Sequence, residues 1–255
     1  MNIIFNFTEK PNGIIFENIE ELWQSCFGDE PSFIRSILRL PEYVGVVYAA
    51  VDGEVVGMAH LLSLDSYKKA YYVYAVATAE EYRGQGIARG IMEYLCKKAC
   101  NDGAILLLHP ANGELAEAYG RMGFKPFSYT YTVECQGDGG AYRFISPSEY
   151  KQYREVFLGG MDFFGWSTDA MTASGCAFIA FEINGDGCAA CINNGKVLEV
   201  CAPFDIEGVA VRRAACGAGE KPEILMFSES PVGAECAVMS YNYCGTGGYF
   251  NLFLD

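Results

Sequence analysis

The segment with the clearest capacity for chemistry is glycine-rich and has the sequence RGQGIAR over residues 83–89. It follows a stretch expected to be a strand, 71–77, and leads directly into a stretch expected to be a helix, 87–100. Glycines let a backbone approach a ligand closely, and the free N–H groups of a first helical turn form an anion site. The ligand expected at such a site is a pyrophosphate. The segment lacks the Lys-Ser or Lys-Thr of a Walker loop and the third glycine of a dinucleotide fingerprint, which excludes both motifs.

A second pattern lies downstream on the next expected strand and helix. A run of leucines leads to Asn112, then to Tyr119 seven residues later, and then to Gly123-Phe124. The RxxGxA pattern of the loop resembles the pyrophosphate loop of GNAT acetyltransferases, and the downstream pattern resembles the Asn…Tyr-x-x-x-Gly-Phe signature of the same family. The resemblance covers residues 1–130 in layout and 73–127 in motif.

The resemblance implies an acetyl-CoA-dependent N-acetyltransferase in which a primary amine attacks the thioester directly. Backbone N–H groups near Val76 would stabilise the oxyanion, and backbone at 76–78 would pair with the pantetheine arm as an added strand. Tyr119 would protonate the thiolate, because a tyrosine with a pKa of about 10 keeps its proton near neutral pH. The alternative for Tyr119 is a tyrosine packed under the sheet. The implied cofactor-binding residues are Val76, Ala77, Thr78, Arg83, Gly84, Gln85, Gly86, Ile87, Ala88, Arg89, Asn112 and Tyr119.

The general base is the least defined part of the expected site. An ammonium acceptor must lose a proton before it attacks, and family members often use a strand glutamate or ordered water. The strand here offers Tyr72 and Tyr74 instead. His60, on the expected strand 55–62, is the candidate base, although a lone strand histidine is more often structural; His109 is a weaker candidate. The acceptor pocket is expected at the ends of the first two helices, around Trp23, Phe27, Asp29 and Glu30.

These residues must be positioned by an α/β (α+β) fold, with a mixed, mostly antiparallel central sheet flanked by helices, as in GNAT proteins. Helical spacing of apolar residues predicts a helix over 18–26, and Ser32 is expected to cap a second one. Asp52-Gly53 supplies the positive φ angles of a tight hairpin turn. The remaining expected elements of this half are strands at 46–51, 55–62, 71–77 and 104–108 and helices at 87–100 and 114–122.

The second half of the chain repeats this order of elements. AFIAFEINGDGCAA lies about 131 positions beyond VVYAAVDGEVVGMA, which favours a duplicated domain. We therefore expect a GNAT domain at 1–132 and a degenerate GNAT-like domain at 133–255, because no glycine-rich loop follows the strand at 196–201. The other expected elements here are helices at 148–157 and 206–216 and strands at 177–182, 187–191, 224–227 and 249–254.

Composition narrows the class of partner. The 255 residues carry a formal net charge of −14 with a pI near 4.6, which disfavours nucleic acid and anionic membranes and suits a small-molecule or peptide amine acceptor. No apolar run approaches the ~18 residues needed to cross a bilayer. The N-terminus lacks a signal peptide and the 11 cysteines form no framework, so we expect reduced thiols in the cytoplasm. Cys188 and Cys191 fall on opposite faces of an expected strand, so we expect no metal site; a homodimer is left open.

Two other functions compete with the transferase. One is a catalytically silent acyl-CoA-binding or regulatory module, which the missing base favours and Tyr119 opposes. The other is a FemX-like aminoacyl transferase, which also uses paired GNAT-type domains. That class binds tRNA, and both the negative charge and the acetyl-CoA loop disfavour it.

Overall fold

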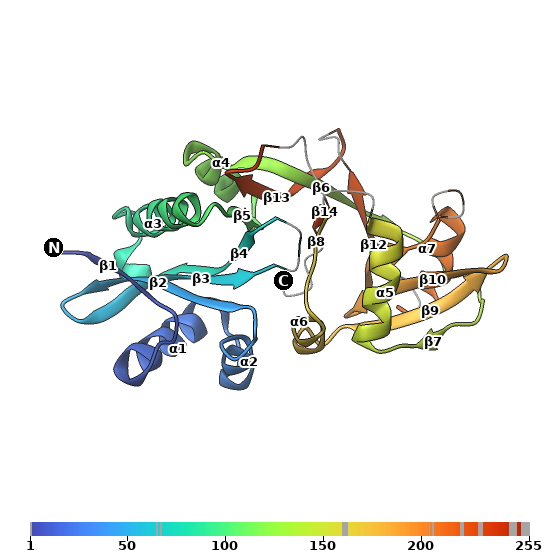
Figure 1. Cartoon of the computed structure of the whole chain (residues 1–255), viewed down its shortest axis with the longest axis horizontal. Helices are drawn as coiled ribbons and strands as arrows, with labels where there is room; N and C mark the ends of the chain where they lie inside the picture. Colours follow the sequence, from blue (N-terminus) through green and yellow to red (C-terminus); the bar gives the residue numbers. More distant parts are fainter. Residues whose placement is uncertain are drawn as a thin grey trace. The chain divides into compact units, whose positions relative to one another are not determined.

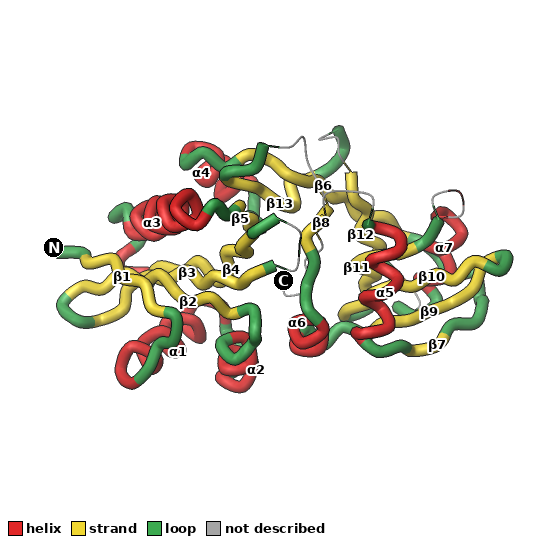
Figure 2. The backbone as a smooth tube through the Cα atoms, in the orientation of Figure 1, coloured by secondary structure: helices red, strands yellow, loops and turns green. Residues whose placement is uncertain are grey.

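The computed structural model describes residues 2–64, 66, 68–159, 163–203, 205, 207–219, 222–228, 232–244 and 249–250. The chain forms two compact units, which Figure 1 colours along the sequence. The first consists of Met1–Lys125 with Met239–Cys244, and the second of Pro126–Val238 with Gly245–Asp255. Helices and strands occur in both units, as Figure 2 shows.

The first unit is built on a mixed sheet with the order β1-β2-β3-β4-β5-β13. Only the β4–β5 pair is parallel, and the other four neighbouring pairs are antiparallel. The last three residues of β13 complete this sheet by pairing with β5, although the strand begins in the second unit. The strands are β1 (Ile4–Thr8), β2 (Tyr43–Val51), β3 (Glu54–Ser63), β4 (Ala70–Thr78), β5 (Ile105–Leu108) and β13 (Glu235–Tyr241).

Four helices cover the two faces of this sheet. Figure 1 shows α1 and α2 on one face and α3 and α4 on the other. The α1 helix buries Ile19, Leu22 and Trp23 at helical spacing, and it ends at Gly28, whose φ of 75° is left-handed. The α3 helix buries a stripe of apolar residues at helical spacing, which includes Ile91 and Leu95. The bounds are α1 (Gly13–Phe27), α2 (Pro31–Ile37), α3 (Ile87–Asp102) and α4 (Gly113–Arg121). A short 3₁₀ helix, η1, covers Glu80–Tyr82.

The second unit repeats this plan. Its sheet has the order β6-β12-β11-β10-β9-β7, again with one parallel pair, β11–β12, between antiparallel neighbours. The strands are β6 (Lys125–Glu134), β7 (Arg143–Phe144), β9 (Ala177–Ile183), β10 (Asp186–Asn193), β11 (Lys196–Cys201) and β12 (Glu223–Ser228). The helices are α5 (Pro147–Leu158), α6 (Thr168–Ala173) and α7 (Glu207–Ala215). A separate parallel pair joins β8 (Phe163–Phe164) to β14 (Tyr249–Phe250).

The predicted fold class, a mixed and mostly antiparallel sheet flanked by helices, is confirmed. The expected helices and strands are present with shifted ends; α1, for example, begins at Gly13, because Asn12 adopts the extended N-cap conformation. The expected cap of the second helix is wrong: α2 begins at Pro31 after the N-cap Glu30, so Ser32 lies within its first turn. The sequence interpretation missed β1, β6, α6 and β13, and also the short elements η1, β7 and β8. Of the closing strand expected at 249–254, residues 251–254 lie outside the described part of the chain.

Candidate active site

The glycine-rich loop has the backbone that its sequence predicts. Gly84 and Gly86 have φ angles of 75° and 81°, and a Cβ added at either would meet no atom within 4 Å. These glycines are therefore required by the left-handed backbone and leave open space above it. Gly86 caps α3, whose first turn carries no acidic side chain. The N–H groups of that turn have no partner within the helix, so the loop can receive an anion.

The side chains beside these glycines tie the loop to the residues that precede it. Arg83 donates from Nε to the carbonyl oxygen of Thr78 at 3.3 Å, and Gln85 donates from Nε2 to the carbonyl oxygen of Glu81 at 3.1 Å. Ile87 is 1% exposed and packs so closely on β3 that a Cβ at Gly57 would lie 2.5 Å from its Cγ2 atom. The loop is thus anchored on both sides.

A β-bulge in β4 is the feature that the sequence interpretation missed. His60 of β3 pairs with Tyr74, but Met58 pairs with Ala77, so β4 has one extra residue between these pairs. Ala75 there has a φ of 49°, which costs a non-glycine residue roughly 1–2 kcal/mol. Bulges of this kind re-aim the backbone next to active sites. No glycine or asparagine marks the position, so no local signal could have revealed it.

The edge of β4 beyond this point is open. Among the described strands, β5 pairs with β4 only through Ala70–Tyr72. The two strands are in register at Tyr72 and Leu107, and no further pair joins them. Backbone groups on that side of Val76 and Thr78 can therefore accept an added extended chain. Val76 and Thr78 are half-buried and Ala77 is buried.

Asn112 and Tyr119 lie at the two ends of α4. Asn112 is the N-cap of that helix, and its Oδ1 atom accepts the N–H of Leu115 at 2.9 Å, which is the capping role expected of an asparagine. Tyr119 is 8% exposed, with its ring 5.9 Å from that of Phe124. Burial raises the pKa of Tyr119, so its hydroxyl keeps a proton to donate at neutral pH. The structure does not bring His109 into this set; it is exposed after β5.

His60 lies inside the sheet on the face covered by α1. The side chain is 0% exposed, and its Nδ1 atom is 3.0 Å from the hydroxyl of Tyr43. Burial lowers the pKa of His60 to about 3, because a charged imidazole there would lose its hydration. The residue is therefore neutral at physiological pH. The structure does not show a path by which an acceptor ammonium could reach it.

The expected acceptor residues gather at the end of α1. Trp23 is fully buried and donates from Nε1 to Asp29 Oδ2 at 2.8 Å. Phe27, 48% exposed, places its ring edge-on to Trp23 at 6.4 Å. Cys26, between them, approaches the carbonyl oxygen of Thr78 at the end of β4, with its Sγ atom 4.0 Å away. These contacts place Asp29 and Phe27 beside the end of β4; Glu30 is exposed at the start of α2.

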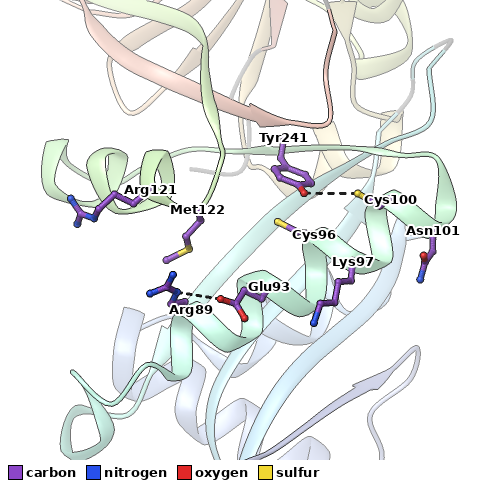
Figure 3. Close-up of a pocket in the computed structure, with 9 residues that line it drawn as sticks. All are labelled: Arg89, Glu93, Cys96, Lys97, Cys100, Asn101, Arg121, Met122 and Tyr241. Carbon is purple, nitrogen blue, oxygen red and sulfur yellow. Dashed lines mark hydrogen bonds and ion pairs between the residues drawn. The ribbon is translucent and has the colours of Figure 1, made fainter.

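A pocket of about 610 Å³ opens along the outer side of α3. Figure 3 shows Arg89, Glu93 and Lys97 on that helix, with Arg121 and Met122 from the end of α4 nearby. Arg89 and Glu93 form an exposed ion pair at 3.2 Å, which contributes little to stability. The remaining lining residues are Cys96, Cys100, Asn101 and Tyr241. Three cationic side chains against one carboxylate make this pocket suited to an anion in an otherwise acidic protein.

The second unit holds a buried ion pair between α5 and β11. Glu199 of β11 pairs with Cys191 of β10, as Tyr74 of β4 pairs with His60 of β3. The carboxylate of Glu199 accepts a bond from Arg154 Nε at 2.7 Å, and both side chains are at most 1% exposed. Tyr150 also donates to Glu199, at 2.7 Å. The Glu199 carboxylate is thus covered and neutralised by Arg154 of α5, and it is not presented to a ligand.

The described residues contain neither a cluster of metal-ligating side chains nor a membrane-spanning helix. No group of three or more histidine, cysteine or acidic side chains there could hold a metal ion. No helix in the same part of the chain is both long and apolar enough to cross a membrane. All 11 cysteines are free thiols, and Cys188 and Cys191 are buried in β10.

Comparisons with known proteins agree with this geometry. The model of the acetyltransferase (GNAT) family matches residues 13–124. Among solved structures, a conserved protein from Enterococcus faecalis V583 superposes with a TM-score of 0.69 at 12% identity, over 94% of this chain and 72% of that one. GNAT-type N-acetyltransferases from Kribbella flavida and Anabaena variabilis each superpose with a TM-score of 0.64 at 13% identity, over 93% of this chain and 71% and 72% of theirs.

At this identity the structural likeness shows the fold alone. No protein with a curated description matches the sequence. The family assignment therefore rests on the matched segment, which contains the loop, the bulged strand and α4. Residues 13–124 belong to the GNAT family of acyltransferases.

Proposed function

We propose that the protein is an acetyl-CoA-dependent N-acetyltransferase that acts on a primary amine through a single site in the first unit. The observation that carries this proposal is the coincidence of two open backbone surfaces. The first turn of α3 is open behind Gly84 and Gly86, and the β4 edge is open beyond its bulge. A nucleotide thioester needs both, one for its pyrophosphate and one for its pantetheine arm.

The residues of this chain fit that co-substrate. The loop from Arg83 to Arg89 offers N–H groups to the pyrophosphate, and the β4 edge offers Val76 and Thr78 to the arm. The side-chain Nδ2 group of Asn112 is available to the arm, because its Oδ1 atom caps α4. We assign the nucleotide end to the pocket along α3, where Lys97 and Arg121 suit a phosphate. Acetyl-CoA supplies the acyl group and the leaving thiolate.

The chemistry requires little from side chains. The amine nitrogen forms a bond to the carbonyl carbon, and the carbon–sulfur bond breaks. Backbone N–H groups at the bulge near Val76 would stabilise the oxyanion, an interaction worth a few kcal/mol in other enzymes. Water would take the proton that the ammonium loses before attack. Tyr119 would give its hydroxyl proton to the departing sulfur, and the second proton lost by the nitrogen as the amide forms would restore the Tyr119 hydroxyl. His60 was our candidate base; its burial and low pKa favour a different role.

The second unit is, in this proposal, a duplicated GNAT-like domain that has lost its cofactor site. The repeated strand order supports duplication, with one parallel pair at the same place in each sheet. The buried pair of Arg154 and Glu199 supports the loss of function. The free thiols suit the cytoplasm, where we place the protein.

The test is turnover of acetyl-CoA with a panel of primary amines by the wild type and by Tyr119→Phe. We expect kcat to fall by about 100-fold or more in Tyr119→Phe, as for loss of a general acid, with the Kd for acetyl-CoA within about 3-fold. Tyr94→Phe, which removes a hydroxyl from a partly exposed tyrosine of α3, is the matched control.

Two results would overturn the proposal in different ways. Equal turnover by Tyr119→Phe and the wild type would remove Tyr119 from the mechanism. Tight binding of acetyl-CoA without turnover of any amine would identify a silent acyl-CoA-binding module instead, which the full burial of the candidate base His60 favours.

A further inference from the structure

His60 lies on β3 directly beside the β4 bulge. It pairs with Tyr74, and the next residue of β4 is Ala75, which has the left-handed φ of 49°. The register between β3 and β4 shifts at this point. His60 therefore flanks the bulge and is placed to hold it, because strained backbone persists only where its surroundings fix it.

His60 contacts Tyr43 and Trp23, and Trp23 in turn contacts Tyr74. Its Nδ1 atom lies 3.0 Å from the hydroxyl of Tyr43 on β2. Its ring lies against Trp23, with ring centroids 4.6 Å apart. Trp23 in turn meets Tyr74 edge-on at 5.7 Å and is itself held by Asp29 at 2.8 Å. The imidazole thus lies between β2, α1 and β4 in one packed group of rings.

The protonation state of His60 follows from this setting. The hydrogen bond between His60 Nδ1 and the Tyr43 hydroxyl forms in either neutral tautomer, with the hydroxyl as donor in one and the Nδ1–H group as donor in the other. The titratable groups facing it are Tyr43 from β2, Tyr74 from β4 and, across Trp23, Asp29 after α1. No carboxylate contacts the ring directly among the described residues. A buried neutral ring of this kind fixes geometry; it does not exchange protons with an acceptor.

We propose that His60 is a positioning residue for acyl transfer. With Tyr43 and Trp23 it fixes Tyr74, and through Tyr74 it fixes the bulge at Ala75 that aims the backbone N–H groups near Val76 at the acyl carbonyl. This inference rests on the proposed function for its catalytic consequence. It does not rest on that function for its structural consequence, which is the rigidity of residues 74–78.

The kinetic test uses two variants that break the same hydrogen bond from opposite ends, Tyr43→Phe and His60→Phe, with His60→Asn as the conservative replacement. We expect kcat to fall about 10-fold or more in His60→Phe and less in Tyr43→Phe, with KM for acetyl-CoA within about 3-fold. Partial recovery is expected in His60→Asn, whose amide can still accept from Tyr43. The pH profile of kcat/KM should keep the same limbs in all four proteins.

Two kinetic outcomes would overturn the proposal. A limb of the pH profile that is present in the wild type and missing in His60→Phe would make His60 the general base. An unchanged kcat in both Tyr43→Phe and His60→Phe would show that the bulge does not depend on His60.

A second measurement separates this inference from the proposed function. Amide hydrogen exchange of residues 74–78 without any ligand should be about 10-fold faster in Tyr43→Phe than in the wild type, with exchange in α3 unchanged. His109→Gln, a substitution at the exposed histidine, should leave exchange in both segments unchanged. Equal exchange at 74–78 in Tyr43→Phe and the wild type would refute the positioning role even if no amine were ever acetylated.

Discussion

Acid should destabilise this protein through one imidazole, and the amount can be worked from the burial of His60. Its pKa is about 3 in the folded chain, against 6.5 for an unperturbed histidine. Between these values the unfolded chain binds one proton more than the folded chain, so stability rises with pH in that window. The contribution is complete above pH 6.5 and is lost as the pH falls toward 3. Each pH unit is worth about 1.4 kcal/mol, so the loss between pH 7 and pH 5 is about 2 kcal/mol.

The assay is scanning calorimetry at pH 7, 6 and 5. For a chain of this size, about 2 kcal/mol corresponds to roughly 4–8 °C in Tm. We expect the fall in Tm between pH 7 and pH 5 to be smaller by that amount in His60→Gln than in the wild type and in His109→Gln. The wild type and the two variants have the same carboxylates, so acid titration of these groups contributes equally to all three proteins. The two substituted residues are the chain's only histidines. An equal fall in all three would show that His60 takes up a proton in the folded state, and a titrating His60 NMR resonance between pH 7 and 5 would show the same directly.

Two further predictions concern the buried ion pair of Glu199 and the pocket residue Arg121. Glu199→Gln should destabilise the second unit by about 3 kcal/mol, because it leaves Arg154 as an uncompensated buried charge. Glu149→Gln, at an exposed pair, should lower the denaturation midpoint far less; equal midpoints for the two variants would contradict this. Arg121→Ala should raise the Kd for acetyl-CoA about 3- to 10-fold and leave the affinity for S-acetylpantetheine, which lacks the nucleotide, unchanged; a parallel loss for both ligands would place the nucleotide outside the pocket.

The sequence predicted those features that leave a local signature. Gly84 and Gly86 signal a left-handed loop, and the stripe that includes Ile91 and Leu95 signals the helix that follows. Asp52-Gly53 signals the hairpin between β2 and β3. In each case the information lies within a few residues of the feature, so that periodicity and turn chemistry suffice.

Features that depend on distant partners were not predicted. The β13 strand pairs with β5 through Ser240 and Leu107, which are more than 130 positions apart in the chain, and no local pattern identifies such a partner. The bulge at Ala75 arises from the shift in register between β3 and β4, and its sequence is an ordinary strand sequence. The burial of His60 depends on Tyr43 and Trp23, which are on other elements. Tertiary packing decides these features, which is why His60 looked like a candidate base in the sequence.

The measurement that tests the central claim most directly is calorimetric titration of acetyl-CoA into the wild type, Gly86→Glu and Gly185→Glu. Both glycines have left-handed φ angles, 81° and 95°, with no atom within 4 Å of an added Cβ, so the two substitutions impose the same strain and charge. Gly86→Glu also places a carboxylate at the N-terminus of α3, where the pyrophosphate should bind. We predict micromolar binding to the wild type and to Gly185→Glu, and none to Gly86→Glu. Equal binding to all three proteins, or none to the wild type, would contradict the account.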